Sequence, residues 1–283
     1  MKQILLLAWI AVVAVAQQTP AFMKAGMLQN NSDNTTTVVA NDPQPLGQAI
    51  ESIRQEYGWQ VNYEMPAYFS HYDLVDNTDP KWRAHYPQAK GVTRAAGGLF
   101  SSSFPSGSST SEEEVLRKVV SDYNVSGNPG RFELRKESDG RYSVVGIAVR
   151  DEAGKDLTVA PILDTPLTIT KEDIAADAAL DLLRSSLSSQ TGKKVILGAY
   201  PAYELHAAHG VIGGENVPAR VLLTQILALT HRPIVWDIRF IADTEPQIYV
   251  LNLDIAKRPQ TDAFGNRILI PIDVAWHPKP QAN

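Results

Sequence analysis

The residues with the clearest metal-binding chemistry lie in the segment Pro201-Ala202-Tyr203-Glu204-Leu205-His206-Ala207-Ala208-His209. On a local helix, His206 and His209 would share one face, with Glu204 nearby. Two imidazoles and a carboxylate form a workable zinc ligand set. Their order does not match a zinc-hydrolase signature, however, and ordinary surface histidines need no ligand. We therefore predict no native metal site, and Glu204, His206 and His209 remain its weak candidates.

Aromatic residues crowd the segment 57–86, most of them within a long insertion that we predict at 65–110. Flat rings with polar tips bind sugars, peptides and partner proteins. Long loops without regular structure are usually functional or disordered. The alternative is that the rings fasten the loop to the rest of the protein. The candidates for partner binding are Tyr63, Tyr68, Phe69, Tyr72, Trp82 and Tyr86.

No catalytic signature occurs in the sequence. The Gly/Ser-rich run from Gly97 to Ser111 lacks the Gly-Lys-Ser/Thr of a phosphate loop, and the chain has neither a Gly-x-Ser-x-Gly elbow nor a Ser-x-x-Lys pair. We expect this run to be a flexible loop. Asp73, Asp76 and Asp79 lack the glycine and distal glutamate of a calcium loop, so we expect solvated acids. The sequence predicts no catalytic residue and no cofactor, and favours a protein that is not an enzyme without deciding the question.

Composition restricts the classes of protein further. The chain has no cysteine, which excludes disulfides and thiolate sites, and its 44% hydrophobic content is enough to build a core. A formal charge of -5, with acids and bases interspersed, gives no basic surface for nucleic acid.

The first residues have the form of an export signal. Met1-Lys2-Gln3 is a short basic start, the run Ile4 to Ala16 has no charge, and Ala14-Val15-Ala16 matches the small-x-small cleavage pattern. A membrane-spanning helix needs about 20 apolar residues, and this run ends too early at Gln17. We predict a signal peptide at 1–16, a polar linker at 17–35, and no membrane span after cleavage.

Helical and alternating periodicities then follow in a repeated order. A helix from Leu46 ends at Gly58 before a strand at 59–63, and a second helix begins with a Ser111–Glu114 capping box and leads to a hairpin at 132–144. The order returns with a Thr170–Asp173 capping box and helix, a strand at 194–197, a helix from Asn216 to Arg232, and strands at 234–240 and 248–250.

This pattern predicts an α+β protein of two tandem small domains, each built as helix-strand, helix-strand-strand, because one such unit cannot bury its apolar face alone. The first domain covers 36–150 and includes the insertion, and the second covers 156–256. The remainder, 257–283, reads as a loop, a strand from Arg267 to Trp276 and a Pro-rich tail.

Two segments of this repeated order resemble a known protein family. Pro45 to Ile50 leading to Tyr57-Gly58-Trp59-Gln60-Val61-Asn62-Tyr63, and Val217 to Leu223 leading to the Trp236 strand, resemble the short N-terminal domain of secretins and TonB-dependent receptors. The resemblance implies two tandem copies of a periplasmic protein-interaction fold without catalytic residues. We expect no outer-membrane barrel or secretin ring after them.

The leading hypothesis is therefore an exported, non-enzymatic protein, periplasmic or secreted, that binds another envelope protein through a sheet edge or the aromatic insertion. The alternative is an envelope hydrolase or carbohydrate-binding protein that uses the insertion and the His206/His209 region. The sequence does not identify the partner or the oligomeric state.

The signal peptide gives the first testable prediction. Because cleavage is expected after Ala16, mass spectrometry of protein from the periplasm or medium should find an N-terminus at Gln17. An N-terminus at Met1 in the membrane fraction would contradict this prediction.

Overall fold

The computed structural model describes residues 26–106, 110–242 and 247–273. It is 28% helix and 40% strand, which confirms the predicted α+β class. The predicted signal peptide, residues 17–25 of the linker and residues 274–283 of the tail lie outside the described residues.

The elements of the first half follow one another along residues 27–150. They are β1 (Met27–Asn30), β2 (Thr35–Asn41), α2 (Pro45–Tyr57), β3 (Val61–Glu64), β4 (Leu74–Asp76), α3 (Pro80–His85), β5 (Thr93–Ala95), β6 (Leu99–Pro105), α4 (Glu112–Val125), β7 (Arg131–Lys136) and β8 (Tyr142–Arg150).

The second half repeats much of this order. Its elements are β9 (Asp156–Thr158), the 3-10 turn η1 (Ile162–Asp164), β10 (Pro166–Ala175), α5 (Ala176–Thr191), β11 (Lys194–Leu197), α6 (Ala202–His206), β12 (His209–Pro218), α7 (Ala219–Ala228), β13 (Ile234–Ile241) and β14 (Ile248–Ile255), followed by the hairpin β15 (Lys257–Thr261) and β16 (Arg267–Pro271).

Local sequence explains where several helices begin or end. Pro45 occupies the first turn of α2, and Gly58 ends the helix in the left-handed conformation at φ 72°. The predicted capping box of α4 is present, with Ser111 and Glu114 each accepting from the other's backbone amide. Gly192 ends α5 in the same way as Gly58 ends α2.

Other local predictions were wrong. The Thr170–Asp173 capping box does not exist, because these residues continue β10, where Asp173 pairs with Val211 of β12. Helix α7 begins at Ala219 rather than Asn216, which lies in β12. Residues 257–261, predicted as loop, form β15 and pair with β16.

The predicted insertion also ends earlier than expected. Residues 99–105 form β6, which pairs with β2 along its length. Phe100, Ser102 and Phe104 are buried and their neighbours are exposed, so the run is a half-buried strand rather than a flexible loop.

The two halves share one topology. In the first half β3 runs parallel to β8, and β8 is antiparallel to β7. In the second half β11 runs parallel to β14, and β14 is antiparallel to β13. Each half adds an antiparallel pair, β2–β6 or β10–β12, so the predicted helix-strand, helix-strand-strand order is present twice.

One sheet nevertheless runs through both halves, in the order β11-β14-β13-β3-β8-β7. β13 lies parallel to β3, with Asp237 opposite Tyr63 and Ile238 opposite Glu64. The segments 36–150 and 156–256 are therefore joined by a shared sheet as well as by the chain.

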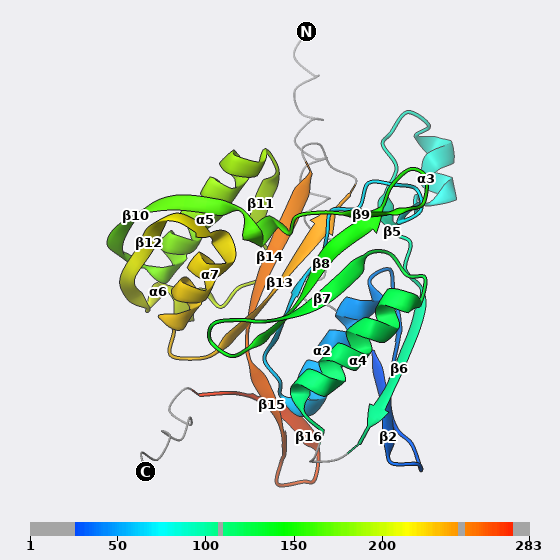
Figure 1. Cartoon of the computed structure of the whole chain (residues 1–283), viewed down its shortest axis with the longest axis horizontal. Helices are drawn as coiled ribbons and strands as arrows, with labels where there is room; N and C mark the ends of the chain where they lie inside the picture. Colours follow the sequence, from blue (N-terminus) through cyan, green and yellow to red (C-terminus); the bar gives the residue numbers. More distant parts are fainter. Residues whose placement is uncertain (1–25, 107–109, 243–246, 274–283) are drawn as a thin grey trace.

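The register of this seam places the helices of the two halves on opposite faces of the sheet. Tyr63 belongs to the core beside α2 and α4, and its partner is the polar Asp237 rather than the apolar Trp236 or Ile238. Helices α5, α6 and α7 gather at one end of the sheet, and α2 and α4 lie at the other (Figure 1).

A buried ion pair holds the halves together across this seam. Arg220 at the start of α7 binds the carboxylate of Glu64 on β3, and its Nε lies 3.1 Å from Asp164 Oδ1. Leu163 donates its backbone amide to the other Glu64 oxygen at 3.1 Å. The side chains of Glu64 and Arg220 are 1% and 6% exposed, so neither charge has water as a substitute partner.

The core of the second half gives a stability prediction. Leu223 is fully buried on α7, so Leu223→Ala should lower the free energy of unfolding by about 2 to 5 kcal/mol in urea titrations. Val221→Ala on the exposed side of the same helix is the matched control and should change it by less than about 0.5 kcal/mol. Equal effects of the two substitutions would show that α7 does not pack as described.

Candidate functional site

The structure separates the weak metal candidates. His206 Nδ1 lies 2.9 Å from Asp177 Oδ2, whereas Glu204 pairs with Arg232 at 3.5 Å. His209 is exposed and begins β12. Within the described part of the chain, no three His, Asp or Glu side chains group in a way that could hold a metal ion.

The aromatic candidates divide into two groups. Tyr63 and Tyr68 are only 2% and 3% exposed and belong to the core, so they are removed from the candidate surface. Tyr68 donates its hydroxyl to the carbonyl of Pro129, which ties the start of the insertion to the α4–β7 loop. The exposed candidates are Phe69, Tyr72, Trp82 and Tyr86.

Two of these exposed rings lie on an arm, residues 77–92, that projects from the body and carries α3 (Figure 1). No residue of α3 is buried. Trp82 and Tyr86 are 50% and 47% exposed, and their ring centroids lie 4.4 Å apart. The ring centroids of His85 and Tyr86 lie 4.6 Å apart, and the two rings are nearly perpendicular. The arm therefore presents a compact group of three rings to solvent.

The arm is nevertheless ordered, because its helix and its base are held by specific contacts. Asp79 caps α3 by accepting from the amides of Lys81 and Trp82. At the base, Arg83 pairs with Asp76 and donates to Thr78 Oγ1 at 3.0 Å. Thr78 Oγ1 also accepts from the amide of Val92 at 2.8 Å, which closes the arm.

A glycine permits this closure. An atom added at the Cβ position of Gly91 would collide with the Arg83 guanidinium and the Thr78 hydroxyl. The side chains on the outside of the arm are mainly basic, since Lys81 and Lys90 are exposed while Asp76 and Asp79 are engaged in the base and the cap. The arm thus combines aromatic surface with positive charge.

Behind the arm, Asp73 joins the insertion to β8. The carboxylate is fully buried and accepts the backbone amide of Arg150 at 2.6 Å. Arg150 also reaches back to the carbonyls of Tyr72 and Gly127. Burial raises the pKa of the Asp73 carboxyl, and the Arg150 contacts oppose that rise only in part. The expectation that Asp73 is a solvated acid was wrong.

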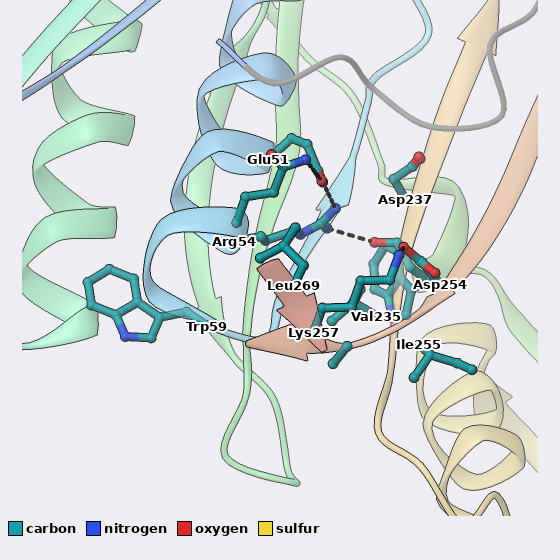
Figure 2. A pocket seen from close by; sticks show the side chains of 12 residues that line it. Glu51, Arg54, Trp59, Val235, Asp237, Asp254, Ile255, Lys257 and Leu269 are labelled. Atoms are coloured by element: carbon teal, nitrogen blue, oxygen red, sulfur yellow. Dashed lines mark hydrogen bonds and ion pairs between the residues drawn. The ribbon is translucent and has the colours of Figure 1, made fainter. Parts of the chain in front are cut away.

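A hollow at the seam between the halves is the second feature of interest. Figure 2 shows Arg54 of α2 reaching between Glu51 and β13, where it bonds Glu51 at 3.1 Å and the carbonyl of Trp236 at 3.2 Å. The hollow has a volume of about 60 Å³. Ligand pockets usually enclose several hundred Å³ (about 300 to 1,000), so this hollow is a structural joint rather than a ligand site.

Sequence reasoning missed the buried charges of Glu64, Asp73, Arg220 and Asp237. Each lies in or beside an apolar run, and burial raises the pKa of Glu64 and of Asp237. Alternation places Glu64 on the face opposite Val61 and Tyr63, which reads as a solvent face, and all four residues of β3 are buried only because the second half covers that other face.

None of the helices in the described residues has the length and apolar character needed to span a bilayer.

The raised pKa of Asp73 predicts a pH dependence. A carboxyl whose folded-state pKa lies above its unfolded value of about 3.9 holds its proton more tightly when folded, so stability falls as pH rises through that interval. Asp73→Asn removes this contribution, and the variant should gain stability relative to wild type between about pH 4 and neutral pH. Urea titrations across this range test it, and parallel stability curves for the two proteins would contradict it.

Comparison with known proteins found no match: no family model, no curated protein and no solved structure is detectably similar to the chain. The resemblance to the short N-terminal domain of secretins and TonB-dependent receptors therefore stays a prediction from the residues. The function is accordingly argued from the geometry of the described residues.

Proposed function

We propose that this chain is an exported, non-enzymatic protein-interaction module, periplasmic or secreted, whose envelope partner docks on the aromatic arm. The observation that carries the proposal is α3, a helix with no buried residue that still displays Trp82. Its companion Tyr86 adds a second half-exposed ring at 4.4 Å. Clustered exposed rings of this kind are typical of binding surfaces.

The construction of the arm supports this proposal. Trp and Tyr provide large contact areas with few rotatable bonds and dominate the energy of many interfaces. The closure at Thr78 and Val92 holds the rings in place before binding, which lowers the entropy lost on association. Exposed Lys81 and Lys90 favour a partner with an acidic surface.

The alternative is a carbohydrate ligand, because exposed Trp and Tyr rings also stack on sugars. The hydrolase form of this alternative has less support. In the His206/His209 region, His206 binds Asp177 and the neighbouring Glu204 binds Arg232.

The arm can be tested by photo-crosslinking in living cells. A photoreactive phenylalanine in place of Tyr86 should yield a discrete protein adduct, whereas the same residue in place of Phe264, which is 89% exposed on the β15–β16 hairpin, should yield none. Adding Trp82→Ala should remove the adduct because it deletes the neighbouring ring.

The controls separate binding from folding. Trp82→Ala should leave the free energy of unfolding within about 0.5 kcal/mol of wild type, since its side chain is half exposed. Adduct formation at Phe264 but not at Tyr86 would contradict the proposal. Arm-dependent binding of soluble envelope glycans without a protein adduct would favour the carbohydrate alternative.

A further inference from the structure

The seam between the two halves is built from two short motifs, and each motif occurs twice in the chain. On the inserting strand β13 the motif is aromatic-acid-aliphatic-Arg, at Trp236-Asp237-Ile238-Arg239, and the same motif stands on β7 at Phe132-Glu133-Leu134-Arg135. In both copies the acid and the arginine form an ion pair.

The accepting side of the seam has a related arrangement on α5, one helical turn earlier, because Arg54 lies four residues before Gly58 and Arg184 lies eight residues before Gly192. On α2 it contains Glu51 and Arg54, paired at 3.1 Å, and on α5 it contains Asp181 and Arg184, paired at 3.2 Å. Arg54 donates to the carbonyl of Val61 on the adjacent strand β3, and Arg184 donates to the carbonyl of Val195 on β11. Val61 and Val195 hold equivalent places, since they pair with Tyr142 and Tyr249 in the two halves.

Among the described residues, one copy of each motif is used for pairing between the halves. β13 inserts beside β3 and α2, which leaves β7 at one end of the sheet and β11 with α5 at the other. The occupied seam has a hollow of about 60 Å³, whereas the open groove beside α5 and β11, lined by Asp177, Asp181, Leu197 and Tyr200, has about 240 Å³. An acid of the adjacent helix lines both spaces, Glu51 in the seam and Asp181 in the groove.

The strand directions allow the two ends to meet in the geometry of the seam. β13 is parallel to β3, and both β11 and β7 run opposite to that direction. A second copy displaced along the sheet therefore brings its β7 beside β11 in parallel, as β13 lies beside β3. The faces also agree, because the helices α5 and α7 stay on the same side of the extended sheet.

We infer that β7 of one copy inserts into the α5–β11 groove of a second copy, so that the protein assembles head to tail. The register of Asp237 opposite Tyr63 places Glu133 opposite Leu197 at this joint. Leu134 supplies the pairing main chain in place of Ile238. Arg184 takes the role of Arg54 and donates to the carbonyl of Phe132.

Asn124 does not close the β7 edge to this pairing. Its side chain holds the main-chain amide and carbonyl of Phe132. The equivalent Trp236 also uses side-chain partners in the seam, where Asn62 Oδ1 accepts from its amide and Arg54 donates to its carbonyl. The residue of β7 that needs a strand partner is Leu134. Its neighbours Glu133 and Arg135 pair with β8, so the main-chain groups of Leu134 point away from β8, toward the open edge.

The assembly is weaker than the internal seam. The ion pair between Glu64 and Arg220 stabilises the internal seam. At β11 the position equivalent to Glu64 is Gly198, which has no side chain to form such a pair. The joint uses different surfaces on its two sides, so it does not close a two-fold dimer and adds copies at both ends. Reversible, concentration-dependent growth is the result.

Engineered cysteines test the register directly, because the chain has no cysteine of its own. A Glu133→Cys copy mixed with a Leu197→Cys copy should form a disulfide-linked heterodimer under mild oxidation, since adjacent strands bring paired Cα atoms within disulfide range. Glu133→Cys mixed with Lys194→Cys, three residues out of register on the same strand, is the matched control and should link at least tenfold more slowly. Equal or absent linkage in both mixtures would overturn the inference.

Sedimentation of the full chain tests the open-ended assembly. The wild-type average mass should rise beyond a dimer as concentration increases. Leu134→Pro and Leu197→Pro each remove an outward edge amide and should each give a monomer, while their mixture should form a 1:1 dimer through the remaining intact edges. A wild type that stays monomeric would overturn the inference. So would a wild type that stops at a dimer, together with a mixture of the two proline variants that stays monomeric. Arg184→Glu is the milder variant if either proline variant does not fold, and should lower the association constant at least tenfold.

Discussion

The buried ion pair between Glu64 and Arg220 determines how the two halves of the molecule sit together. A charge without water requires a partner in a fixed place, and removing one member of such a pair costs about 3 to 5 kcal/mol. Burial raises the pKa of the Glu64 carboxyl, and the Arg220 guanidinium opposes that rise. The start of α7 is thereby fixed over β3, and the strand that follows α7, β13, is delivered to the edge of β3.

That delivery produces an arrangement that neither half would adopt alone. Because Asp237 rather than Trp236 shares a face with Tyr63, the halves turn their helices to opposite sides of a common sheet. The polar faces of both halves then become interior surface at the seam, which explains why Asp237 and Asn252 are buried and bonded to each other. The same arrangement leaves β7 at one end of the sheet and the α5–β11 groove at the other.

The aromatic arm depends on a different kind of support. Its rings do not pack on the core, so their order comes from hydrogen bonds at Thr78 and from the buried Asp73 beneath them. The hydrogen bond from the amide of Arg150 offsets part of the cost of burying the Asp73 carboxylate. Within the described residues, the second oxygen of Asp73 has no hydrogen-bond partner. A buried charge at the foot of an exposed aromatic group is consistent with a rigid presenting element rather than a loose loop.

Local patterns alone determined the α+β class, the order of the main helices and strands, the start of α4, and the C-terminal ends of α2 and α5, because a glycine or a capping box acts within one helical turn. They also pointed to Trp82 and Tyr86 as exposed rings, but not to the burial of Tyr63 and Tyr68. Local patterns failed at β6, where serines hid the alternation, and at Thr170, where pairing with β12 outweighed a helix-start motif. The shared sheet, the opposite faces and the partners of Glu64 and Asp73 were decided only by the tertiary structure, because Glu64 and Arg220 are 156 residues apart in the chain and contacts at that separation leave no periodicity to read.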